Sequence, residues 1–326
     1  MPQPNTRLPL FGMLNILIAA WMVVVASPPD GRAQQPAFDG RRFFHSGDGR
    51  IRLANDGNGM MFSGIYRRGG GNYDRTALEA ICGVFNAPYD PEFKNVSLRL
   101  VEYLDFLEDR LSPGATITIV SGYRSPRYNT RLRKQGGLAA KASLHQYGMA
   151  ADIKMEGVSP RRLWDTVKMI GFGGAGYYHE NVVHVDVGPA RSWDEKTSGV
   201  GTGISDDNKL IGMVTDFDVY RPGEKLSWRF IRMTAFPIEV NTEFVMERLA
   251  GGGQVTQESL FTPLFAIPAI GSCVRFEGIA QMASITWKLP DTLPPGRYRV
   301  RAHFCNNPWR DMPRDVMTPE FKIVEP

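Results

Sequence analysis

The most informative stretch of this chain is Ser143-Leu144-His145-Gln146-Tyr147-Gly148-Met149-Ala150-Ala151-Asp152. A second stretch follows further along, Val183-His184-Val185-Asp186. Side chains alternate along a β-strand, so His184 and Asp186 are predicted to project from one face. A loop carrying His145 and a strand beginning at Asp152 can bring both residues to His184. A lone histidine on a strand is more often structural. Together, however, two histidines and one aspartate match the protein ligands of a catalytic zinc site.

The segments around these stretches predict alternating helices and strands. Asp74, Ser125-Pro126 and Ser159-Pro160 are typical helix starts. Helices are predicted over 74–84, 97–111, 125–135 and 159–170. Short strands are predicted within 40–70, and further strands over 116–120, 150–155 and 182–187, with a glycine-rich turn over 171–176. This pattern predicts an α+β domain over residues 40–197 with an antiparallel sheet at its centre.

Helical periodicity is scarce in the last third of the chain. Residues 198–208 are rich in Gly, Ser, Thr and Asp and are predicted to be a linker. Strands are predicted over 225–233, 236–245, 284–289 and 297–304. Short strands separated by turns are typical of a small all-β sandwich, here over 209–326.

The three cysteines are predicted to play two different parts. Cys273 and Cys305 both lie in the predicted sandwich, and we predict that they form a disulfide. Two small buried side chains are the alternative for this pair. Cys82 lies on the apolar face of a predicted helix and is expected to be a buried free thiol.

The N-terminus predicts export. Arg7 precedes an apolar run over 10–26, and small residues follow up to Ala33. We interpret residues 1–33 as a secretory signal peptide. An uncleaved N-terminal anchor is the alternative, and only that alternative predicts contact with a membrane. In both cases the rest of the chain is expected to be periplasmic or otherwise exported, where disulfides can form.

Composition excludes several classes of protein. A hydrophobic share of 43% and a charged share of 22% exclude a disordered, collagen-like or multi-spanning chain. The net charge of +4 is too small to predict a nucleic-acid partner. Three cysteines without a CxxC pair exclude a thiolate zinc site.

A local basic run adjoins the first stretch. Residues 121–151 contain no acidic residue, and their basic residues are Arg124, Arg127, Arg131, Arg133, Lys134 and Lys141. Such a run is usually a solvated helix face. The other interpretation is a cationic approach that attracts substrates with free carboxylates.

Three motifs occur in the first two thirds of the chain: Ser-x-His-x-x-Gly-x-Ala-x-Asp at 143–152, Ser-Gly-Tyr-Arg-Ser-Pro at 121–126, and Gly-x-Gly-Tyr-Tyr…Val-His-Val-Asp-x-Gly…Arg-x-Trp at 174–193. Together they resemble the motifs of the LAS-type zinc peptidases, which include D-Ala-D-Ala carboxypeptidases and the hedgehog signalling domain. The last motif is similar to the murein endopeptidase K branch. The resemblance covers about residues 45–195 and does not extend to 205–326. It implies a hedgehog/D-Ala-D-Ala peptidase-like antiparallel sheet with helices.

The resemblance also implies roles for individual residues. Zinc would be held by His145, Asp152 and His184. Arg124 would stabilise the oxyanion or hold a substrate carboxylate, with Ser143 in the same pocket.

Further roles in the site are predicted for Tyr123 and for two acidic residues. Tyr123, next to Arg124 in the motif at 121–126, is predicted to bind substrate. For the proton shuttle we favour Asp186 over Glu180, which precedes His184 by four residues. An alternative role for Asp186 is to orient His184.

The function implied is that of an exported zinc-dependent peptidase. It would hydrolyse amide bonds in peptidoglycan stem peptides or cross-links, as an endopeptidase or a carboxypeptidase. The alternative from another class is a non-catalytic cell-wall-binding or scaffold protein that retains a structural zinc site.

Overall fold

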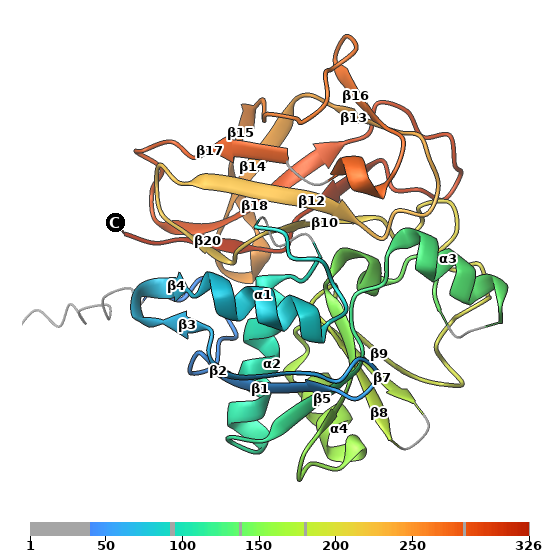
Figure 1. Ribbon diagram of the computed structural model, residues 1–326. Coiled ribbons are helices and arrows are strands. Elements are labelled where there is room, and N and C mark those ends of the chain that lie inside the picture. The colour runs from blue at the N-terminus through green and yellow to red at the C-terminus, as the bar shows by residue number, and fades with distance from the viewer. Residues whose placement is uncertain (1–39, 92–94, 137–138, 179–180, 283–284, 326) are drawn as a thin grey trace, which may run out of the picture. The chain divides into compact units, whose positions relative to one another are not determined.

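Four α-helices in the described part of the chain begin at or beside the predicted caps. The computed structural model describes residues 40–91, 95–136, 139–178, 181–282 and 285–325, so the predicted signal peptide lies outside them. The helices are α1 (Arg75–Val84), α2 (Leu98–Leu111), α3 (Pro126–Lys134) and α4 (Pro160–Ile170). The side chains of Asp74, Ser125 and Ser159 each accept a hydrogen bond from a backbone N–H in the first turn. The predicted helices are confirmed. All four lie in the part drawn blue to green in Figure 1.

A seven-stranded sheet accompanies these helices. Its strand order is β2 (Met60–Ile65), β1 (Arg50–Asn55), β5 (Thr116–Ser121), β6 (Ala150–Met155), β8 (Val182–Asp186), β7 (Gly174–Tyr178) and β9 (Arg191–Asp194). β5, β6, β8 and β7 pair antiparallel at its centre, whereas β1–β5 and β7–β9 are parallel pairs. A hairpin of β3 (Arg67–Arg68) and β4 (Asn72–Tyr73) precedes α1, with the 3-10 turn η1 (Gly69–Gly71) between them. The α+β class is therefore confirmed.

The glycine-rich stretch 171–176 is not simply a turn, as the sequence predicted, because β7 begins at Gly174. A Cβ atom at Gly174 would lie 2.1 Å from Oδ2 of Asp186. A Cβ atom at Gly176 would lie 2.7 Å from the indole ring of Trp193. Gly174 and Gly176 therefore leave room for side chains of the neighbouring strands, and they do so within a strand and not in a turn.

The C-terminal part consists of strands and two short 3-10 turns, η3 (Gly251–Gly253) and η4 (Ile279–Met282). One sheet has the order β10 (Gly212–Thr215), β12 (Lys225–Ile231) and β17 (Ile285–Lys288). Another has the order β11 (Val219–Tyr220), β20 (Phe321–Ile323), β18 (Gly296–His303), β14 (Phe244–Leu249) and β15 (Val255–Phe261), with β19 (Asp315–Met317) paired to β18. A third pairs β13 (Ile238–Asn241) with β16 (Cys273–Phe276).

The prediction of a single strand over 236–245 is wrong. The chain forms β13, turns, and then forms β14 in a different sheet. The side chain of Asn241 accepts a hydrogen bond of 2.8 Å from the backbone N–H of Glu243, which closes the turn. Asn side chains commonly stabilise turns in this way.

Buried contacts join the segments on either side of residues 198–208. Arg99 on α2 forms an ion pair of 2.6 Å with Asp218, and both side chains are only 4% exposed. The backbone N–H of Met233 donates to the hydroxyl of Tyr147 at 3.0 Å. The part of the chain from residue 40 onward accordingly clusters into one unit. Within that part, no helix is both long and apolar enough to span a bilayer.

The two expectations for the cysteines are confirmed. Cys273 and Cys305 form a disulfide, and Cys82 is a buried free thiol on α1. The disulfide closes a loop across a sequence separation of 32 residues. Since a cross-link reduces the conformational entropy of the unfolded chain, a loop of this length is expected to stabilise the fold.

Replacing both Cys273 and Cys305 with Ala is expected to lower the free energy of unfolding by about 2–4 kcal/mol, the effect of removing one loop-closing disulfide. Urea unfolding followed by tryptophan fluorescence measures the change. A reducing agent should destabilise the native protein to a similar extent and leave the double variant unchanged. Equal stability of the oxidised native protein and the variant would contradict this expectation.

A buried carboxyl group in α2 introduces a pH dependence into the stability. Asp105 is fully buried and accepts hydrogen bonds from the Tyr66 hydroxyl at 2.7 Å and from the Gly49 N–H at 2.9 Å. Burial raises the pKa of this carboxyl from 3.8 to about 7. The folded protein therefore binds this proton more tightly than the unfolded chain, so the associated stability is complete below about pH 4 and is lost as the pH rises through 7.

Asp105→Asn is expected to reduce this pH dependence, because an amide cannot ionise. The variant should gain stability relative to the native protein between pH 5.5 and 8.5, by up to about 4 kcal/mol. Thermal unfolding at several pH values measures the effect. Asp56→Asn, in an exposed turn, should leave the native pH profile unchanged. If the stability of Asp105→Asn changes with pH in the same way as that of the native protein, Asp105 does not titrate in this range.

Candidate metal centre

Three predicted ligands come together from two strands and one 3-10 turn. Asp152 on β6 lies directly opposite His184 on β8 in the antiparallel register. His145 lies in the turn η2 (Leu144–Tyr147), just before β6. Gly148 ends η2 in a left-handed conformation, φ 62°, and a Cβ there would lie 2.2 Å from the carbonyl oxygen of Asn95. Glycine is therefore required at the point where the chain turns from His145 into the strand.

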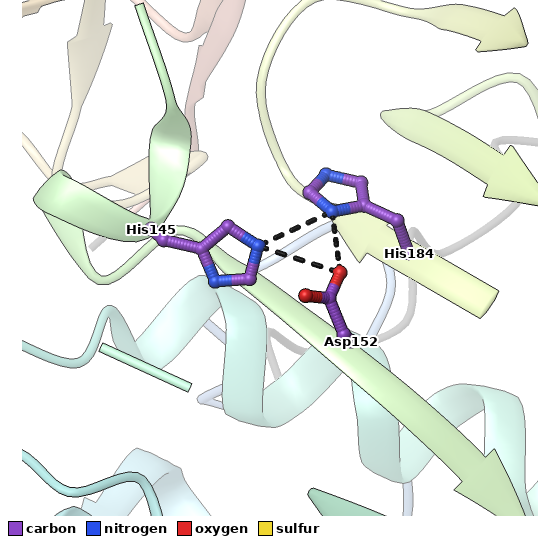
Figure 2. A group of neighbouring side chains, drawn as sticks. All are labelled: His145, Asp152 and His184. Atoms are coloured by element: carbon purple, nitrogen blue, oxygen red, sulfur yellow. Dashed lines mark hydrogen bonds and ion pairs between the residues drawn. The ribbon is translucent and has the colours of Figure 1, made fainter. Parts of the chain in front are cut away.

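The three side chains point toward one another, as Figure 2 shows. Nε2 of His145 is 3.3 Å from Nδ1 of His184 and 3.5 Å from Oδ1 of Asp152. Nδ1 of His184 is 3.0 Å from the same oxygen. A tetrahedral zinc ion with bonds of about 2.0–2.1 Å separates its ligand atoms by about 3.3 Å. The spacing of these atoms therefore suits such an ion.

The outward-facing ring nitrogens are also occupied. Nδ1 of His145 lies 2.7 Å from the carbonyl oxygen of Gly122, and Nε2 of His184 lies 2.9 Å from Oδ2 of Asp186. Each acceptor keeps a proton on the outer nitrogen and leaves a lone pair on the inner one. Two lone pairs and a carboxylate oxygen then face one centre, and this donor set calls for a cation.

Asp186 is fully buried behind His184. Its carboxylate accepts hydrogen bonds from His184, from the backbone N–H groups of Gly174 and Gly188, and from both terminal nitrogens of Arg191. Burial by itself would raise the pKa of Asp186, but the charges and hydrogen bonds of Arg191 and His184 outweigh it and hold the pKa far below its ordinary value. A carboxylate that is inaccessible and so weakly basic is poorly suited to shuttle protons. Its position instead fits the alternative role, orienting His184.

The other predicted site residues occupy different positions. Arg124 donates to Oδ2 of Asp152 at 2.7 Å and to the Ser121 hydroxyl at 3.0 Å. Arg124 and Ser143 both line a pocket that contains the three candidate ligands. Tyr123 is half-buried against the hydrophobic core and does not line that pocket. Glu180 lies outside the described residues.

The pocket has a volume of about 400 Å³ and includes residues to which the sequence analysis assigned no role: Tyr178, Arg191, Trp193 and Arg232. The Trp193 ring lies 5.1 Å from that of His184, and its N–H donates to the Tyr178 hydroxyl at 2.8 Å. Arg191 and Trp193 form the Arg-x-Trp part of the motif at 174–193, so the sequence did contain a signal for these two pocket residues. Arg232 belongs to no motif. The stretch 198–208, predicted to be only a linker, also contributes lining residues.

The fold and the site together define a class: an α+β domain with a pocket that holds a buried His/Asp/His cluster. Residues 47–193 match the family described as peptidoglycan L,D-endopeptidase MepK. The matched segment contains all three members of the cluster. The resemblance to the murein endopeptidase K branch is therefore confirmed.

Individual relatives agree with this match. The peptidoglycan L,D-endopeptidase MepK of Escherichia coli K12 is 35% identical over 103 residues, which are 31% of this chain and 57% of the relative. The probable enzyme of the same name from Haemophilus influenzae is 39% identical over 80 residues, 24% of this chain and 43% of the relative. The chain thus spans little more than half the length of these relatives at most. Among solved structures, a Pseudomonas fluorescens DNA glycosylase is similar at 14% identity over 38% of this chain and 36% of its own, with a TM-score of only 0.22.

Asp186→Asn is expected to weaken zinc binding about 10- to 100-fold, because the amide orients His184 less well and makes it less basic. His145→Ala should weaken binding further, since it removes a ligand. Calorimetric titration of the metal-free protein with zinc measures both effects. Asp165→Asn, on an exposed part of α4, is the control and should bind zinc as the native protein does. Native affinity in Asp186→Asn would show that this carboxylate does not support the metal centre.

Proposed function

We propose that this protein is an exported zinc-dependent peptidase that hydrolyses amide bonds in peptidoglycan stem peptides or cross-links. The observation that carries the proposal is the tetrahedral spacing of the ligand atoms of His145, Asp152 and His184. This cluster lies within the segment that matches the peptidoglycan endopeptidase family. The names of the relatives favour an endopeptidase acting on an L,D bond. The proposed export depends on residues 1–33 as a signal peptide.

The residues present suit zinc, since two imidazole nitrogens and one carboxylate oxygen are among its preferred ligands. When bound, zinc polarises the scissile carbonyl and lowers the pKa of water to about 7. His145, Asp152 and His184 would hold the ion, and Asp186 would fix the ring of His184.

Arg124 is suited to stabilise negative charge that develops on the substrate. Its Nε and one terminal nitrogen donate to Ser121 and Asp152. Its other terminal nitrogen has no hydrogen bond to the described residues. The side chain is 11% exposed and lines the pocket, where a fixed guanidinium can donate to a developing oxyanion. For the proton shuttle we propose Glu180, because Asp186 is buried behind His184.

We also propose that the chain forms two domains. Residues 40–197 would form the peptidase domain with a hedgehog-like sheet. Residues 209–326 would form a β-sandwich from the β10-β12-β17 sheet and the β14-β18 sheet. Both of these sheets contribute to the core, through residues such as Trp228 and Phe244, whose rings lie 5.5 Å apart.

The purified, zinc-loaded protein is expected to release cleaved peptides from defined cross-linked muropeptides. His145→Ala should lose at least about 100-fold in kcat/KM, because the metal supplies several kcal/mol of transition-state stabilisation. Mass spectrometry of the products identifies the bond that is cut.

His303→Ala is the matched control, since His303 lies on β18 and does not line the pocket. It should cleave at the native rate. Chelation should abolish cleavage by the native protein, and added zinc should restore it. Undiminished cleavage by His145→Ala, or no cleavage of any muropeptide by the zinc-loaded native protein, would refute the proposed function.

A further inference from the structure

The described residues that line the pocket around the candidate metal centre carry three guanidinium groups, on Arg124, Arg191 and Arg232, and one carboxylate, on Asp152. Arg124 pairs with Asp152, and Arg191 pairs with Asp186. Arg232, which follows β12, lines the same pocket but has no ion pair or side-chain hydrogen bond to the described residues. The charge of Arg232 is therefore in excess even before a metal cation binds.

Arg232 is half-buried, which makes this excess charge unfavourable. Its Nε atom is buried and has no hydrogen-bond partner in the described part of the chain. Desolvation, together with the neighbouring charge of Arg191, lowers the pKa of the guanidinium to about 10. A partly buried cation without a partner lowers stability, so folding alone does not explain a residue of this kind.

The backbone at Arg232 is held in an unusual conformation. Its φ angle is 60°, in the left-handed region that non-glycine residues rarely adopt. Its neighbour Met233 donates its N–H to the hydroxyl of Tyr147, which lies in the turn that carries His145.

A second set of bonds fixes the chain just beyond this point. The side-chain oxygen of Asn208 accepts from the N–H groups of Thr234 and Ala235, and its amide nitrogen donates to the Ala235 carbonyl. Such over-determined backbone strain is characteristic of functional positions.

We propose that Arg232 binds a carboxylate of the substrate within the metal pocket and so selects peptides that carry a free carboxylate next to the scissile bond. This inference rests on the proposed peptidase function and names its specificity residue. A guanidinium presents two parallel N–H groups that match the two oxygens of a carboxylate, and a bound carboxylate supplies the missing counter-charge. Arg232 lies outside the matched segment 47–193, so this selectivity would be contributed by the C-terminal part of the chain.

Two kinds of carboxylate in a stem peptide share this chemistry: the C-terminal carboxylate and a carboxylate on a side branch. A panel of three synthetic substrates separates them, namely the parent peptide, its C-terminal amide and its side-branch amide. Steady-state kinetics of the zinc-loaded native protein and of Arg232→Gln on each substrate gives the test.

We expect Arg232→Gln to raise KM for the parent peptide about 10- to 100-fold, the effect of losing a charged hydrogen bond, with a smaller change in kcat. The native protein should show a similar rise on one of the two amides, which identifies the carboxylate that is bound. On that amide the native protein and Arg232→Gln should be alike. Arg232→Lys keeps the charge but lacks the two parallel N–H groups. Its KM for the parent peptide should therefore lie between those of the native protein and Arg232→Gln.

A control and a stability measurement distinguish binding from a structural role. Arg310→Gln removes a charge from an exposed position of the C-terminal part and should leave KM unchanged. Arg232→Gln should melt at the same temperature as the native protein or higher, because an unpaired, half-buried cation is removed. A lower melting temperature, or an unchanged KM for the parent peptide, would overturn the inference. If the native protein cleaves none of the three peptides, the proposed function itself fails; if it cleaves and Arg232→Gln matches it throughout, only this inference fails.

Discussion

One buried carboxylate organises the candidate metal centre. Asp186 is fully buried, and such a charge is tolerated only when donors surround it. Those donors come from the start of β7, from the loop that leads to β9, from Arg191 on β9 and from the ring of His184. Satisfying this charge therefore fixes three strands relative to one another. It also sets the direction in which His184 presents its inner nitrogen.

The other two candidate ligands depend on strand register. Because β6 and β8 pair antiparallel, with Asp152 opposite His184, a shift by one residue would turn Asp152 to the other face of the sheet. His145 is fixed differently, by the left-handed Gly148 and by its own carbonyl, which accepts the N–H of Arg124 at 3.1 Å. The site thus combines two strand positions with one restrained turn, which is the kind of rigidity that a metal centre requires.

Much of the fold and of the candidate site could be predicted from the sequence, because it depends on local chemistry. The caps at Asp74, Ser125 and Ser159, and the alternation that places His184 and Asp186 on one face, depend on near neighbours only. The errors arose where distant contacts decide. Gly174 belongs to a strand because it pairs with Arg191 on β9, and the split of 236–245 reflects a change of sheet. No local pattern marks Arg232, since its importance comes from a pocket whose other residues lie at least 22 positions away along the chain.

Buried contacts also connect the C-terminal sheets to the rest of the described chain. A separate binding module would need only a flexible connection to the segment that matches the endopeptidase family. Here the buried pair Arg99–Asp218 and the bond from Met233 to Tyr147 tie the two segments together. A buried ion pair adds little net stability but is costly to break, so it favours one arrangement over the alternatives. The arrangement it favours keeps residue 232 beside the turn that carries His145. Through Arg232, the C-terminal part therefore contributes directly to the pocket that contains the candidate ligands.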